Sequence, residues 1–144
     1  MRHKTSLWIA VCAVLAAALG IQITLHAQAS TAAGVYTEAQ AMRGAALFKE
    51  QCATCHGDDL KGSGDVAPPL TGEAFLSGWQ GKTLGDLFDK IGVTMPAVDP
   101  GSLKPQQTAD LIAHILSTSK YPAGTTELAS TQDALNQIKI DAAK

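Results

Sequence analysis

The stretch Cys52-Ala53-Thr54-Cys55-His56 constrains this chain more than any other. Two thiols separated by two residues and followed directly by an imidazole form the attachment signature of a c-type haem. In such a site both sulfurs bond covalently to the porphyrin and the histidine binds its iron. The sequence therefore predicts one covalent haem c, attached through Cys52 and Cys55, with His56 as an iron ligand.

Cysteine pairs with this spacing also occur in thiol-disulfide proteins and in zinc sites. The third cysteine of the chain, Cys12, lies far away in an N-terminal apolar segment. A zinc site needs more ligands than one pair supplies, and a thioredoxin-like site needs a strand and a helix around the motif. Haem attachment is the leading interpretation, and a haem-free thiol-disulfide protein is the alternative.

The first 29 residues have the features of an export signal. Two basic residues precede an apolar run over residues 7–25, and Ala27-Gln28-Ala29 has the small-x-small form of a cleavage site. The run approaches the length that crosses a bilayer, so an uncleaved N-terminal anchor is the alternative. We expect a bacterial periplasmic protein, which contacts the outer face of the inner membrane only if this segment is retained.

Residues 30–144 are expected to form one domain, with a short C-terminal extension from about residue 121. Removal of residues 1–29 takes away two of the 11 basic residues and none of the 13 acidic ones, so the formal net charge changes from -2 to -4. Because the lysines are scattered and no long run of like charge occurs, a nucleic-acid partner is not expected. Aromatic residues are few, and a buried porphyrin would add the apolar mass that a small core lacks.

The helical signals predict an all-α domain with three to five helices around the haem. Thr37 with Gln40 and Thr83 with Asp86 have the form of helix N-terminal caps, and Gly92 supplies a stop. Apolar periodicity then places helices over residues 37–51, 84–91 and 105–119, with a marginal one after residue 130. Residues 57–72 are rich in glycine and proline and predict a loop, and no strand is predicted.

The residue opposite His56 on the iron decides between an electron carrier and a reactive haem. Met42, Met95 and His114 are the candidates. Met95 precedes Pro96, and a residue before proline is biased away from helix, which suits a loop that crosses the far haem face. Met42 on the first helix is interpreted as core filler, and His114 as a packed residue on the rim of a helix.

Two further features lie near the expected site. The Ala67-Pro68-Pro69-Leu70 turn could present a carbonyl to the second ring nitrogen of His56, or be only a stiff turn. Trp79 is either core mass or a buried indole donor to a haem propionate.

With the haem motif, Pro68-Pro69-Leu70, Thr94-Met95-Pro96 and Ala109-Asp110-Leu111-Ile112-Ala113 in this order, residues 36–120 resemble a monohaem class I cytochrome c. The resemblance implies that the Pro68 carbonyl accepts from His56 and that Met95 is the distal iron ligand. We also expect Leu70 and Trp79 to be among the cofactor-binding residues. It also implies a crossing of the first and last helices at Gly44 and Phe48, near Leu111. The family commonly has tyrosine where this chain has His114.

Residues 75–91, Met95-Pro96, residues 100–103 and residues 121–124 are similar to a subgroup of small bacterial cytochromes associated with quinoprotein dehydrogenases. This likeness implies a pyrroloquinoline-quinone dehydrogenase as electron donor and an acceptor on the side of a terminal oxidase. We therefore expect a single-electron carrier between redox proteins that is not itself an enzyme. The alternative is a haem enzyme or gas sensor whose sixth coordination position is open.

Overall fold

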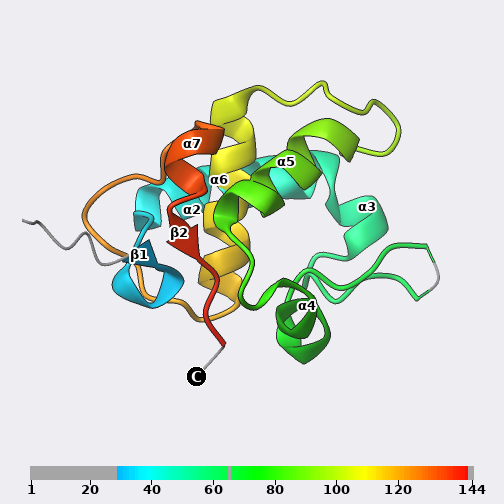
Figure 1. Ribbon diagram of the computed structural model, residues 1–144. Helices are drawn as coiled ribbons and strands as arrows, with labels where there is room; N and C mark the ends of the chain where they lie inside the picture. The colour runs from blue at the N-terminus through cyan, green and yellow to red at the C-terminus, as the bar shows by residue number, and fades with distance from the viewer. Residues whose placement is uncertain (1–28, 65, 143–144) are drawn as a thin grey trace, which may run out of the picture.

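The computed structural model describes residues 29–64 and 66–142, so the expected export signal lies outside the described residues except for Ala29. Within this part the all-α prediction is confirmed, and none of the helices has the length and apolarity needed to cross a membrane. In chain order the elements are β1 (Ala29–Ser30), η1 (Thr31–Ala33), α2 (Glu38–Gln51), α3 (Ala53–His56), α4 (Gly72–Trp79), α5 (Leu84–Thr94), α6 (Pro105–Thr118), α7 (Gln132–Leu135) and β2 (Ile138–Lys139) (Figure 1).

Helices α2 and α6 form the central crossing of the fold. Gly44 of α2 is buried, and a Cβ atom added there would overlap the carbonyl oxygen of Asp110 and lie 3.0 Å from the Cβ of His114. Phe48, one turn further along α2, has its ring centroid 5.3 Å from that of His114. The absence of a Cβ at residue 44 therefore sets how closely the two helix backbones approach, which explains a glycine inside a helix.

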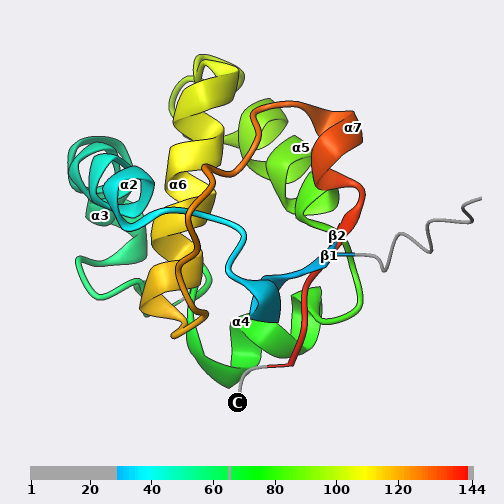
Figure 2. The ribbon, with the colours of Figure 1, turned by 90° about the vertical axis from the view of Figure 1, so that its left-hand side faces the viewer.

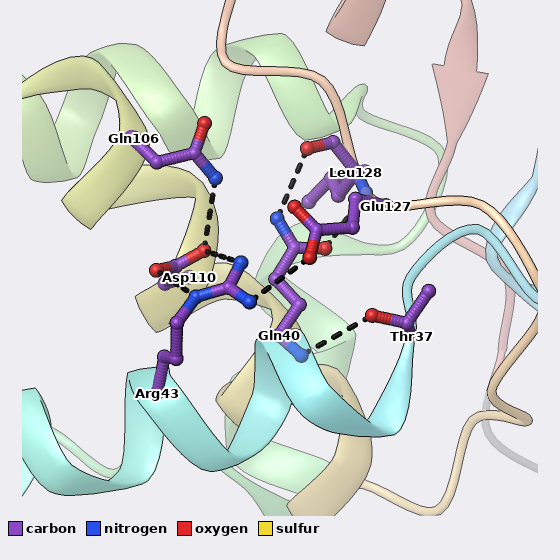
Figure 3. A network of polar contacts seen from close by, with 7 residues as sticks. All are labelled: Thr37, Gln40, Arg43, Gln106, Asp110, Glu127 and Leu128. Carbon is purple, nitrogen blue, oxygen red and sulfur yellow. Dashed lines mark hydrogen bonds and ion pairs between the residues drawn. The ribbon is translucent and has the colours of Figure 1, made fainter.

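A charged network reinforces this crossing from the outside (Figure 3). Arg43 donates from Nε and Nη2 to the two carboxylate oxygens of Asp110, at 3.0 and 3.1 Å. Its Nη1 donates to Glu127 at 2.9 Å, and Gln106 donates to Asp110 at 3.0 Å. The two-pronged contact fixes the orientation of both side chains, which a single contact would not do.

Residues 121–142, which we call the C-terminal strap, return over the helices after α6 ends. Figure 2 shows the strap passing along α6 to α7 and then descending to β2 beside β1. Gln40 of α2 binds the strap through two hydrogen bonds. The Gln40 side-chain amide donates to the Leu128 carbonyl at 3.0 Å and accepts from the Leu128 N–H at 2.7 Å. Leu128, Leu135 and Ile140 are at most 3% exposed. The strap is thus a part of the core.

The two short strands were not predicted from the sequence. Ala29 and Ser30 of β1 pair in parallel with Ile138 and Lys139 of β2. A two-residue strand is too short to produce the alternating pattern that identifies a strand in a sequence. Beside this pair, the Asp141 N–H donates to the Thr31 hydroxyl at 3.0 Å.

Helix α5 begins as predicted but ends later. The Thr83 hydroxyl accepts from the Asp86 N–H at 3.1 Å, and the Thr83 N–H donates to the Asp86 carboxylate at 2.8 Å. Gly92 does not adopt the left-handed conformation of a helix stop, so the helix continues to Thr94 and ends before Met95. Helix α4 was not predicted from the sequence. Only two of its residues, Phe75 and Leu76, are buried, so its sequence has little of the periodic apolar pattern that identifies a helix.

Gly44→Ala tests the close approach of α2 and α6. The added methyl must push Asp110 and its backbone away, so we expect the free energy of unfolding to fall by about 1–3 kcal/mol, measured by urea denaturation. The matched control is Gly78→Ala in α4, where an added Cβ meets nothing within 4 Å. That variant should be more stable by up to about 1 kcal/mol through helix propensity alone. Equal effects at both positions would contradict the role given to Gly44.

Candidate functional site

The motif residues are brought together on the short helix α3, directly after α2. Cys52 lies between the two helices and is half-buried, Cys55 is exposed, and both thiols are free. The His56 N–H donates to the Cys52 carbonyl at 2.9 Å, which closes one helical turn. His56 itself is 7% exposed. One turn therefore presents two unpaired thiols and one buried imidazole.

The ring of His56 is fixed by the proline turn. Its Nδ1 lies 2.9 Å from the carbonyl oxygen of Pro68. Because a carbonyl oxygen only accepts, Nδ1 carries the proton, and in the neutral ring Nε2 keeps its lone pair. This is the tautomer and the orientation that a metal-binding histidine needs.

The loop that carries Pro68 is tied back to α3 by its own backbone. The Gly62 N–H donates to the His56 carbonyl at 2.8 Å, and the Ser63 hydroxyl donates to the Cys55 carbonyl at 2.6 Å. Gly62 has φ +77°, and a Cβ there would overlap the Ala67 carbonyl and lie 2.9 Å from the carbonyl carbon of Pro68. Sequence reasoning missed Gly62, and its only signal was the density of glycines in this loop.

Met95 is half-buried and lies immediately after α5. Its backbone is extended, with φ -123° and ψ 153°, as its position before Pro96 predicts. Its N–H donates to the Ile91 carbonyl at 2.9 Å, so the position of Met95 follows that of α5. Helices α3 and α5 both lie to the right of α6 in Figure 1 and flank it in Figure 2. His56 and Met95 are thus supplied by two separate elements.

The other candidate residues have different surroundings. Met42 is 68% exposed, so the interpretation as core filler is wrong, because its helix turns this side chain outward. His114 packs on Phe48, and burial lowers its pKa.

Leu70 and Trp79 are half-buried and pack against the core. The ring centroids of Trp79 and Phe75 are 6.1 Å apart. The Lys82 ammonium lies over the Trp79 ring, 4.7 Å from its centroid.

The environment of Cys52 disfavours the thiol-disulfide alternative. Burial, with a smaller contribution from Cys55, raises the pKa of the Cys52 thiol to about 11. An attacking cysteine needs a lowered pKa, because the thiolate is the nucleophile. At neutral pH this thiol is protonated.

The donor set fits a haem c. It combines two free thiols on one turn, a buried imidazole with Nδ1 engaged and Nε2 available, and a thioether at the end of a helix. Histidine with methionine is an axial pair found in electron-carrying haem proteins.

The comparisons with known proteins agree with this donor set. A family model described as cytochrome c oxidase, cbb3-type, subunit III matches residues 39–115, which is more than half of the chain. A curated relative, the cbb3-type cytochrome c oxidase subunit FixP of Bradyrhizobium sp. (strain ORS 278), is 41% identical over 71 residues. The alignment covers 44% of this chain and 24% of the relative, so this chain spans about a quarter of that protein. No solved structure shows significant similarity.

These findings correct one expectation and support another. The expectation that the protein is not an enzyme is wrong, because the matching family and the relative are both described as subunits of an oxidase. The expected cofactor is confirmed: a domain of this kind carries one covalent haem c with its iron.

Gly62→Ala tests whether the loop holds the Pro68 carbonyl against His56. Gly64 offers a matched control, because it also has a positive φ, +60°, but an added Cβ there meets nothing within 4 Å. Gly64→Ala should lower the free energy of unfolding by about 1–2 kcal/mol through backbone strain alone. Gly62→Ala should lower it further and speed the exchange of the Nδ1 proton of His56, followed by NMR of the haem-loaded protein. Equal exchange rates in both variants would contradict this role of Gly62.

Proposed function

Because the chain belongs to the family described as cbb3-type cytochrome c oxidase subunit III, we propose that it is an electron-carrying haem domain that delivers single electrons in an oxidase chain. The observation that carries the proposal is the imidazole of His56, buried and held by Pro68 with its Nε2 available. When bound, the haem c supplies a one-electron ferric/ferrous couple.

In this proposal each site residue has a distinct task. Cys52 and Cys55 would anchor the macrocycle, and His56 would bind the iron through Nε2. Met95 would be the second iron ligand, and its thioether would favour the ferrous state relative to a more basic ligand. Pro68 orients His56, and Leu70 and Trp79 would contribute apolar surface to the haem site. With both ligands bound, the iron would have no open position, which suits a carrier.

Exposed residues of the motif and of the loops that carry Pro68 and Met95 support brief contact with a redox partner. Cys55 is exposed, and the loops that carry Pro68 and Met95 expose Val66 (76%) and Val98 (92%). Exposed apolar side chains of this kind are common in small transient interfaces.

The family description supports an acceptor on the oxidase side. The likeness to cytochromes associated with quinoprotein dehydrogenases supports such a dehydrogenase as the donor.

The proposed domain organisation is an export signal over residues 1–29 followed by a periplasmic haem domain over residues 30–144. The basic start, the apolar run and the Ala27-Gln28-Ala29 sequence support export. If the segment is retained, it anchors the domain to the outer face of the inner membrane.

Carbon monoxide binding to the ferrous protein tests Met95. In the wild type the ligand must displace the thioether, so only a minor fraction of the protein is competent to bind. Met95→Ala removes this competition, and the apparent affinity for carbon monoxide should rise by about 10- to 1000-fold. Met42→Ala is the control, since this exposed methionine should leave the affinity unchanged. Rapid, tight binding to the wild type would favour a haem enzyme or gas sensor with an open sixth position.

The intact mass of the protein, purified from a host that exports and attaches haem c, tests the other assignments. We expect the mass of residues 30–144 plus one haem. A mass that includes residues 1–29 would support the anchor instead, and a mass without haem would contradict the cofactor assignment.

A further inference from the structure

The C-terminal strap holds the beginning of α5 by several independent contacts. Ile140 donates to the Lys82 carbonyl and accepts from the Gly81 N–H, both at 2.9 Å. Within the strap, Gln132 donates to the Gly85 carbonyl at 3.0 Å. The residues that lead into α5 and its first turn are therefore fixed by the strap.

The tightest of these contacts is between Gly85 and Asn136. Gly85 is buried, and a Cβ there would overlap the side-chain oxygen of Asn136 and lie 2.8 Å from its Cγ and 3.0 Å from its backbone nitrogen. The main overlap is with the Asn136 side chain, because the backbone nitrogen would have to give way by only a few tenths of an ångström. A side chain at residue 85 must therefore displace the Asn136 side chain, through which the strap contacts α5.

Helix α5 packs against both α6 and the strap. Its contacts with the strap are to α7 and β2. The helix is continuous from Leu84 to Thr94, and the Met95 N–H continues its hydrogen bonding to Ile91. A displacement at Gly85 is therefore passed along a rigid helix to the residue at its far end.

We propose that the C-terminal strap is the positioning element for Met95, and that it acts through the contact of Asn136 with Gly85. The inference rests on the proposed role of Met95 as an iron ligand. The strap lies beyond residue 115, where the family match ends. In this chain the second axial ligand thus depends on a segment that the family match does not include.

Gly85→Ala in the full haem-loaded protein tests this inference. The readouts are the sulfur-to-iron charge-transfer band of the ferric protein and the carbon monoxide affinity of the ferrous protein. We expect a weakened band and carbon monoxide affinity raised about tenfold, which corresponds to about 1.4 kcal/mol. Alanine is a better helix former than glycine, so helix propensity alone would stabilise α5. It would therefore not weaken the band or raise the carbon monoxide affinity. Gln132→Ala, a milder variant that removes only one hydrogen bond to Gly85, should change both readouts in the same direction.

Two controls separate the contact from general effects of substitution. Gly78→Ala makes the same change in α4, in open space, and should leave both readouts unchanged. Adding Asn136→Gly to Gly85→Ala removes the overlapping side chain and should return both readouts toward wild type. A normal band and normal affinity in folded Gly85→Ala and Gln132→Ala would overturn the inference while Met95 remained the ligand. Absence of the band from the wild type would instead overturn the assignment of Met95, and this inference with it.

Discussion

The close approach of α2 to α6 is the constraint on which the rest of this structure depends. Gly44 lets the carbonyl of Asp110 come so near that no Cβ fits between the helices, and Arg43 binds the Asp110 carboxylate across the same crossing. The cysteine and histidine motif follows α2 directly, and the C-terminal strap attaches to α2 through Gln40. A shift of α2 against α6 would therefore move both the haem attachment turn and the strap.

The site combines a rigid half and a half that depends on distant contacts. His56, Gly62 and Pro68 lie within 13 consecutive residues, and short backbone hydrogen bonds hold them together. Met95 instead follows α5, whose first turn is held by Gln132 and Asn136 of the strap. One proposed iron ligand is thus fixed by local structure and the other by tertiary structure.

The sequence was informative where local chemistry determines the outcome. Thr83 and Asp86 cap α5 as predicted, and the all-α fold and the haem c follow from periodicity and from a five-residue motif. The sequence was uninformative where residues far apart in the chain determine the structure. Gly92 resembles a helix stop, but it does not adopt the left-handed conformation, and α5 continues to Thr94. Met42 is a large apolar residue of the kind found in cores, but it lies on the exposed face of α2. The pairing of β1 with β2 leaves no pattern in either strand, because each has only two residues.

The pairing of β1 with β2 also sets an order of events during biosynthesis. It joins Ala29 and Ser30 to Ile138 and Lys139, and a neighbouring hydrogen bond joins Ala32 to Asp141, 109 residues further along the chain. These contacts cannot form until residue 141 has been made. The haem motif and its proline loop are complete by residue 70, well before the residues that pair with β1. The attachment turn can therefore form from local contacts, whereas the pairing of β1 with β2 joins segments that are more than 100 residues apart.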